Sequence, residues 1–271
     1  MLNKIIENKK KEIEINKKKL PLPSFKNKLS SSKRDFRKAI SKNRVSIIAE
    51  FKRKSPCKNI IEKQFNMQTI INIYNRYADA ISILTDANFF SGSLKDMKNV
   101  SKLTHLPILR KDFIIDEYQI YEARLYNADA ILLIASILSK NEINNFIRIT
   151  KKYNMHCLVE VHTEEELNKV LNTKAQIIGI NNRNLNTLKI DLETTLRIAD
   201  KIPSDKIIVS ESGIQNRNYV EKIKNKVNAI IIGTLFMNSL NLEENMEKIS
   251  SQNEIFCNQN DKNKNMWNNE L

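Results

Sequence analysis

Eight short runs rich in isoleucine, valine and leucine recur along the 271-residue chain, with starts about 20–33 residues apart. The runs are Ile47–Phe51, Ala80–Leu84, Pro107–Lys111, Ala128–Ile134, Cys157–Val161, Ile177–Asn181, Ile207–Glu211 and Ala229–Gly233. Each run is almost continuously apolar, which is typical of parallel strands covered on both faces. The gaps hold helical patterns with apolar residues at i, i+3 and i+4, as in DEYQIYEARLYN, TEEELNKVLN and RNYVEKIKN. This order predicts an α/β protein in which helices alternate with strands.

Eight such strand–helix units over about 200 residues favour a (β/α)8 TIM barrel. A doubly wound open sheet is the alternative, but it usually has fewer strands, and no G-x-G-x-x-G motif follows the first run. We therefore expect a barrel domain over residues 47–249.

Both ends of the chain extend beyond these units. Residues 1–46 carry helical patterns over Leu2–Lys18 and Arg34–Ile40, separated by PLPSF, and predict an N-terminal helical extension across one mouth of the barrel. Residues 250–271 are polar and asparagine-rich, and we expect a disordered tail. The alternative for the tail is a final helix that packs through its few large apolar residues, Ile255, Phe256 and Trp267.

Composition narrows the class of protein. The chain is 41% apolar, yet no apolar run approaches the roughly 18 residues that a transmembrane helix needs. The N-terminus lacks a secretory apolar region, so we expect a cytoplasmic protein without a membrane partner.

The three cysteines, Cys57, Cys157 and Cys257, are far apart and form no C-x-x-C. The histidines show no ligand spacing with them, and we expect neither a disulfide scaffold nor a metal site.

The formal net charge of +14 raises the possibility of a nucleic-acid partner. The lysines, however, are spread along the chain, with a local excess at residues 4–42, and no RNA-binding signature or helix-turn-helix pattern accompanies them. We expect no nucleic-acid partner. The oligomeric state is left open by the sequence.

The chain has only four glycines, Gly92, Gly179, Gly213 and Gly233, where average proteins contain about 7% glycine. Gly213 and Gly233 directly follow apolar runs. A glycine between a strand and a helix is a common way to expose backbone N–H groups to a phosphate. The alternative is that both are ordinary turn glycines.

Polar side chains stand at the carboxyl ends of five runs, where barrel enzymes carry their chemistry. Glu50 and Lys52 end the first run, Lys111 the third, Glu160 the fifth, Asn181 and Arg183 the sixth, and Glu211 and Ser212 the seventh. One buried charge is often a structural ion pair, but five matching strand ends favour a shared polar site. Such a site can hold both a general acid and a general base.

Six segments together resemble the indole-3-glycerol phosphate synthase family of tryptophan biosynthesis, over roughly residues 20–240. They are AEFKRKSP, SILTDANFFSGSL, LPILRKDFIIDEYQIYEAR, LVEVHTEEEL, IIGINNRNL and IIVSESGI. The resemblance implies a (β/α)8 barrel that converts 1-(2-carboxyphenylamino)-1-deoxyribulose 5-phosphate into indole-3-glycerol phosphate, carbon dioxide and water. It also implies this small-molecule phosphosugar as the substrate, with no cofactor and no metal.

The resemblance further implies roles for individual residues. Lys111 is the general acid that protonates the ribulose carbonyl, and Glu160 is the base. Lys52 serves the later dehydration or holds the substrate carboxylate, and Glu50 belongs to the same catalytic group. The implied substrate-binding residues are Ser55 in the loop after the first run, Phe90 and Phe113 as walls for the aromatic ring, and Asn181, Arg183 and Glu211. The implied phosphate-binding residues are Ser212, Gly213, Gly233 and Thr234.

The first loop departs from the family pattern, because it reads SPCKN where the family usually has SPSKG. We expect the activity to survive this change, whereas the dynamics of the loop are open. Three other readings stay possible from the sequence. One is a sister phosphate-sugar barrel such as phosphoribosylanthranilate isomerase. The others are a basic binding protein with steeply salt-dependent nucleic-acid binding, and a barrel that keeps its motifs without activity.

Overall fold

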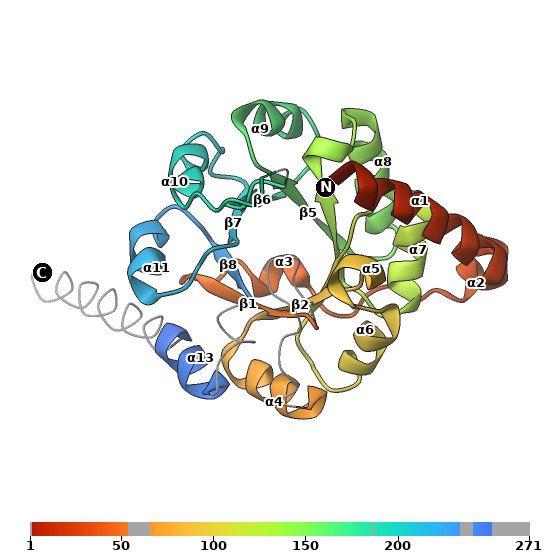
Figure 1. The fold of residues 1–271 in the computed structure, drawn as a ribbon, viewed down its shortest axis with the longest axis horizontal. Helices are drawn as coiled ribbons and strands as arrows, with labels where there is room; N and C mark the ends of the chain where they lie inside the picture. The colour runs from red at the N-terminus through yellow and green to blue at the C-terminus, as the bar shows by residue number, and fades with distance from the viewer. Residues whose placement is uncertain (1, 54–65, 186, 234–240, 251–271) are drawn as a thin grey trace, which may run out of the picture.

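The computed structural model describes residues 2–53, 66–185, 187–233 and 241–250. Eight parallel strands form a closed barrel in chain order, and the last strand pairs with the first (Figure 1). The strands are β1 (Ser46–Phe51), β2 (Ala80–Leu84), β3 (Ile108–Lys111), β4 (Ala130–Ile134), β5 (His156–Val161), β6 (Ile177–Asn181), β7 (Ile207–Glu211) and β8 (Ala229–Ile232). The predicted (β/α)8 barrel is confirmed.

The strand boundaries follow the predicted runs closely. β2, β6 and β7 have the predicted bounds, and the others differ by one or two residues at an end. The largest difference is at β4, which begins at Ala130 rather than at Ala128. The N–H of Ala128 donates to the carbonyl of Ala123 at 2.9 Å, so this residue still belongs to the end of the preceding helix.

Most helices outside the barrel begin at a residue whose side chain accepts a backbone N–H, as Asn66, Ser93, Asp116 and Thr163 do. The helices are α4 (Met67–Tyr77), α5 (Ala87–Phe90), α6 (Leu94–Val100), α7 (Glu117–Leu125), η2 (Ala135–Ile137), α8 (Lys140–Lys151), α9 (Glu164–Leu171), α10 (Glu193–Ala199), α11 (Arg217–Ile223) and α13 (Leu242–Ser250). The caps are encoded locally, and two helical segments predicted from the sequence, DEYQIYEARLYN and TEEELNKVLN, begin at such a cap.

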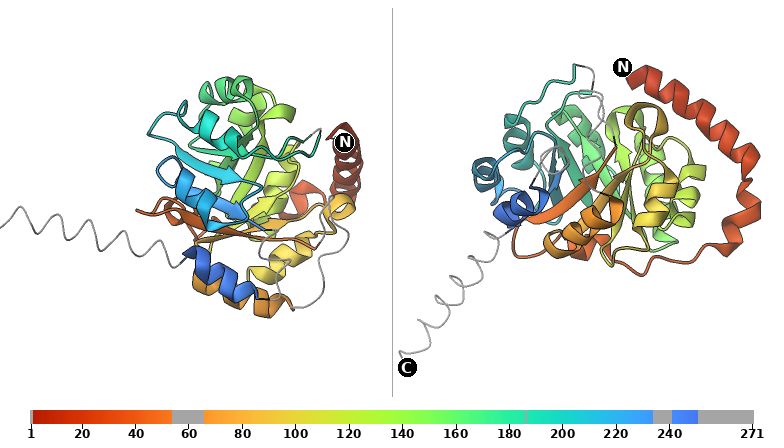
Figure 2. Two further views of the ribbon diagram at one scale, coloured as in Figure 1. Left: turned by 60° about the vertical axis from the view of Figure 1, so that its left-hand side comes forward. Right: turned by 60° about the horizontal axis from the view of Figure 1, so that its bottom comes forward.

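The residues before β1 form the expected helical extension. It consists of α1 (Leu2–Lys19), α2 (Leu22–Phe25), η1 (Lys26–Lys28) and α3 (Phe36–Ala39). The PLPSF segment was expected only to separate two helices, but its last four residues form the short helix α2. Its prolines allow this, because Pro21 stands before the helix and Pro23 lies in its first turn, where no N–H is needed. α1 lies along α7 on the outside of the barrel (Figures 1 and 2).

Two buried clusters hold the fold together. The larger lies between the strands and the surrounding helices. The smaller fills the inside of the barrel, where Phe36 and Ile40 of the extension pack against inward residues such as Ile48 and Leu109. α3 lies within the ring of strands in Figure 1 and so closes one end of the barrel. No helix among the described residues is long and apolar enough to cross a membrane.

The proposed division into residues 1–46, 47–249 and 250–271 stays a prediction. Of the tail, only Ser250 belongs to the described residues, as the last residue of α13. Both readings of the remaining tail, disorder and a packed helix, lie outside the described residues.

Candidate active site

The strand period places the predicted polar residues inside the barrel. Residues two apart on a strand share a face. The inward apolar residues Ile48, Leu109, Leu158 and Val209 are followed two positions later by Glu50, Lys111, Glu160 and Glu211. These four charged side chains therefore enter one cavity from β1, β3, β5 and β7, at the carboxyl ends of the strands.

Lys111 is the centre of this group. Its Nζ lies 3.1 Å from Glu50 Oε2 and 3.0 Å from Glu211 Oε2. Burial lowers the pKa of Lys111, but the attraction of Glu211, Glu50 and Glu160 outweighs it and raises the pKa above its ordinary value. The ammonium group is therefore held in its charged form.

Glu50 links the two lysines of the site. Its other oxygen, Oε1, accepts a hydrogen bond of 2.6 Å from Lys52 Nζ. Burial raises the pKa of Glu50, but Lys52 and Lys111 outweigh that effect and lower it to about 2. A side chain at Gly233 would not fit here, because its Cβ would collide with Glu50 Oε1. The glycine after β8 thus leaves space for this carboxylate.

Glu211 differs from Glu50 in its electrostatics. It is fully buried, and burial together with the nearby carboxylates of Glu160 and Glu50 raises its pKa to about 7, although Lys111 lowers it. Gly179 on the neighbouring strand leaves room for it, since a Cβ there would collide with Glu211 Oε1. Lys52 and His162 offset the charges of Glu50 and Glu160, and Glu211 is the carboxyl group of the three whose pKa is raised towards neutrality.

Glu160 has a histidine partner that the sequence analysis did not single out. His162 Nε2 lies 3.3 Å from Glu160 Oε1, and His162 Nδ1 lies 3.1 Å from Glu166 Oε2. Burial lowers the pKa of His162, but these two carboxylates outweigh it and raise the pKa to about 10. In turn, burial raises the pKa of Glu160, but His162, Lys111 and Asn181 lower it below its ordinary value. Glu160 is thus kept as a carboxylate.

The histidine makes stability depend on pH. Its pKa rises from 6.5 to about 10 on folding, so its contribution is complete below the lower value and is lost as the pH rises through the upper one. We expect His162→Asn to lower the free energy of unfolding at about pH 6 and to have little effect at about pH 11. Urea unfolding at a series of pH values measures this. The exposed His105→Asn is the control, and an equal loss at both pH values would contradict the prediction.

Aromatic and aliphatic side chains form the wall of the pocket. Phe90 and Phe113 both line it, and their rings contact each other with centroids 6.5 Å apart and planes tilted by 33°. The two rings therefore make one continuous apolar surface rather than two facing plates. Leu2 and Ile5 of α1 line the same pocket, so the N-terminal extension contributes directly to it.

The turn after β7 has an unusual backbone. Ser212 has φ 66° and Gly213 has φ 79°, and both line the pocket. A Cβ at Gly213 would lie 2.5 Å from Ile190 Cγ2, so the position needs glycine for space as well as for conformation. α11 begins only at Arg217. Gly213 therefore lies in the turn between β7 and α11, before the helix begins.

The structure brings most of the predicted residues into one pocket. The lining includes Glu50, Lys52, Phe90, Lys111, Phe113, Glu160, Asn181, Arg183, Ser212, Gly213 and Gly233, and Glu211 contacts Lys111 beside it. Ser55 and Thr234 lie outside the described residues. Within the described ranges, no group of three or more histidine, cysteine, aspartate or glutamate side chains has the geometry to hold a metal ion.

The pocket also has residues that sequence reasoning missed. Most are apolar, including Leu2, Ile5, Leu132, Leu185, Leu188 and Ile190, and three are polar, namely Asp86, Asp112 and Gln215. Leu132 is on β4 and Ile5 is on α1, and the sequence alone does not distinguish either from an ordinary core residue. The spacing of Ile5, Lys9 and Ile13 at four-residue intervals was the available signal for α1, since it marks a buried face that contains a lysine.

Comparison with known proteins identifies the family of this barrel. The family described as "Indole-3-glycerol phosphate synthase" matches residues 2–249. The chain belongs to the indole-3-glycerol phosphate synthase family. The family resemblance read from the sequence is therefore confirmed. Individual residue roles are not assigned by this match and stay predictions.

Named relatives match this chain over different shares of their own length. The indole-3-glycerol phosphate synthase of Caldanaerobacter subterraneus is 44% identical over 88% of this chain and 93% of its own length. That of Alkaliphilus metalliredigens is 41% identical over 93% of this chain and 98% of its own length. The tryptophan biosynthesis protein TrpCF of Buchnera aphidicola is 42% identical over 92% of this chain, but over only 55% of its own length. The chain thus spans about half the length of this relative.

Proposed function

We propose that the protein is an indole-3-glycerol phosphate synthase, a carboxy-lyase of tryptophan biosynthesis. Its substrate would be 1-(2-carboxyphenylamino)-1-deoxyribulose 5-phosphate. The observation that carries the proposal is the placement of Lys111 among Glu50, Glu160 and Glu211, beside an apolar wall, in a barrel of this family. Such a pocket offers a proton, a base and a surface for an aromatic ring.

The first chemical step uses the ammonium group of Lys111. The ring carbon that bears the carboxylate attacks the ribulose carbonyl, and the new carbon–carbon bond pushes electrons onto the carbonyl oxygen. Lys111 donates its proton to that oxygen as it becomes an alkoxide, which is a far stronger base than any carboxylate nearby. Carbon dioxide then leaves, and its bonding electrons restore the aromatic ring. The preformed positive charge stabilises the oxygen most in the transition state.

The second stage removes water. The hydroxyl group at the former carbonyl carbon leaves with a proton from an acid, and the adjacent methylene carbon loses a proton to a base. Lys52 is the second ammonium group in the pocket and would serve as the acid, or would hold the substrate carboxylate. Glu160 would take the carbon-bound proton, because it is held ionised by His162. Arg183 and Asn181 would orient the polyol chain.

The phosphate would lie at the turns after β7 and β8, against the backbone of Ser212, Gly213 and Gly233. Gly213→Asp adds a negative charge beside the expected dianion, and we expect KM to rise at least tenfold, which is about 1.4 kcal/mol. Gly213→Ala is the matched control, since it adds the same Cβ and the same backbone strain without the charge. Steady-state kinetics measures both. An unchanged KM for Gly213→Asp would refute this placement of the phosphate.

Formation of indole-glycerol phosphate from the carboxyphenylamino substrate, followed by fluorescence, tests the proposed function. Turnover that saturates with substrate and disappears in Lys111→Met supports it, and no turnover by a folded protein rejects it. We also propose that the protein acts in the cytoplasm without a nucleic-acid partner. The buried free thiol of Cys157 fits a reducing compartment.

A further inference from the structure

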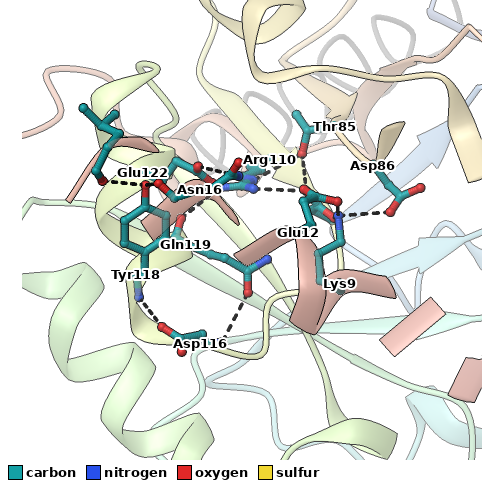
Figure 3. Close-up of polar contacts among 12 residues, drawn as sticks. Lys9, Glu12, Asn16, Thr85, Asp86, Arg110, Asp116, Tyr118, Gln119 and Glu122 are labelled. Carbon is teal, nitrogen blue, oxygen red and sulfur yellow. Dashed lines mark hydrogen bonds and ion pairs between the residues drawn. The ribbon is translucent and has the colours of Figure 1, made fainter. Parts of the chain in front are cut away.

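A lysine of the N-terminal extension is buried next to the active-site pocket. Lys9, in the middle of α1, has a side chain only 1% exposed. Its Nζ lies 2.9 Å from Asp112 Oδ1, 3.0 Å from Asp86 Oδ2 and 2.9 Å from Glu12 Oε2. Figure 3 shows the ammonium group reaching from α1 to Asp86 and back to Glu12. The lysine therefore joins the extension to two separate loops of the barrel.

The two aspartates each fix one of the pocket's aromatic residues. Asp86 is the N-cap of α5 and accepts the N–H of Phe89 at 2.8 Å, and this one-turn helix ends at Phe90. Asp112 follows Lys111 directly, and its Oδ1 accepts the N–H of Phe113 at 2.8 Å. A group that holds both aspartates in place thus also sets the positions of the two rings that form the apolar wall.

A second buried cation, Arg110, binds the other oxygen of Asp112. The guanidinium group of Arg110 is 1% exposed and lies 3.1 Å from Asp112 Oδ2 and 3.0 Å from Glu122 Oε2 of α7. Thr85 Oγ1 also donates to Asp112 Oδ2, at 2.6 Å. Both oxygens of Asp112 are therefore engaged: Oδ1 contacts Lys9 of α1, and Oδ2 contacts Arg110 and Thr85 of the barrel.

Burial and the surrounding charges act on the pKa values of Lys9 and Asp112. Burial lowers the pKa of Lys9, but Asp112, Asp86 and Glu12 outweigh it and raise the pKa above its ordinary value. Burial raises the pKa of Asp112, but Lys9 and Arg110 outweigh it and lower it to about 2. Lys9 and Asp112 are thus both held in their charged forms. Removing the lysine would leave buried carboxylates without their cation.

We propose that Lys9 is a positioning residue for the active-site pocket, rather than only an anchor for the N-terminal extension. Its ammonium group holds α1 against the loops after β2 and β3 at the same time. This contact sets where Leu2 and Ile5 stand relative to the aromatic wall, and so fixes the shape of the surface offered to the aromatic part of the substrate. The inference rests on the proposed function, because it concerns the same pocket.

The test compares Lys9→Met with Lys10→Met, a neighbouring exposed lysine of the same helix. Kinetics are measured at a temperature where every variant is folded by circular dichroism. We expect Lys9→Met to lower kcat/KM by about 10- to 100-fold, mostly through KM, because misplaced walls weaken substrate positioning. Lys10→Met should match the wild type. If Lys9→Met does not fold, Asp86→Asn takes its place, since it removes the charge of one carboxylate that binds Lys9.

A third variant separates positioning from simple destabilisation. Asp79 is a buried aspartate immediately before β2, at the opposite end of the barrel, and it accepts from Arg44 and from the N–H of Ile47. Asp79→Asn should lower the melting temperature while leaving KM unchanged. The proposal is overturned if Lys9→Met keeps kcat/KM within about threefold of the wild type, or if Asp79→Asn raises KM as much as Lys9→Met does.

Hydrogen exchange gives a readout that does not need turnover. In Lys9→Met, we expect faster amide exchange both in α1 and in the loops over residues 85–92 and 112–116, and no change in α9 or α10. Faster exchange confined to α1 would mean that the lysine only anchors the helix, and would reject the proposal. If the wild type shows no turnover, the proposed function fails, while the exchange pattern still decides whether Lys9 couples the extension to these loops.

Discussion

Lys111→Met is expected to lower kcat by about 10²–10⁴-fold, the range typical of a lost general acid. KM should change much less, because the ammonium group interacts most strongly with the carbonyl oxygen when that oxygen gains charge. Methionine keeps most of the length of the side chain and removes only the proton and the charge. Lys111→Arg should restore the charge but little of the rate, since a guanidinium group is a poor proton donor near neutral pH.

The control for this prediction is Lys102→Met, an exposed lysine away from the pocket, which should behave like the wild type. Circular dichroism and steady-state kinetics on the same samples separate misfolding from loss of chemistry. A folded Lys111→Met that turns over within tenfold of the wild type would remove Lys111 from the role of acid. Lys52, which is the other ammonium group on Glu50, would then be the first candidate.

Glu160→Gln is expected to lower kcat by a similar factor of about 10²–10⁴, because the amide keeps the shape of the side chain but cannot accept a proton. The loss should appear at the dehydration stage. The ring-closed, decarboxylated intermediate should therefore accumulate in a single turnover, and rapid quenching with chromatography detects it. Glu165→Gln, an exposed change in α9, is the matched control. Glu160 is not the base of this step if its glutamine variant turns over without a build-up of intermediate.

Much of the fold could be predicted because its signals are local. The apolar runs mark buried parallel strands, and residues such as Asp116 and Thr163 mark helix starts by capping them. The alternation of side chains along a strand then decides which charges meet. In LRKDF, Lys111 enters the cavity, whereas its neighbour Arg110 points to the other face and binds Glu122 of α7. The sequence therefore predicts different surroundings for these two adjacent cations, because neighbouring residues of a strand face opposite sides.

The remaining parts of the site depend on contacts between distant segments. The partners of Lys9 are on the loops after β2 and β3, and no local pattern connects them to the first helix. His162 likewise looks like an ordinary residue between a strand and a helix until the fold places it between Glu160 and Glu166. The turn around Gly213 likewise depends on a distant segment. The cap of α11 is Asn216, and in the turn before it a side chain at Gly213 would collide with Ile190.

The pairing of β1 with β8 has a consequence for how the protein is made. Ser46 aligns with Ala229, so the first strand has no neighbour on one side until almost the whole barrel has left the ribosome. An unpaired strand edge readily joins the edge of another chain. Gly233, which leaves space for Glu50, follows β8, so the cavity is complete only after β8 has been made. Chains that end before β8 would therefore leave this edge of β1 unpaired and would be prone to aggregate.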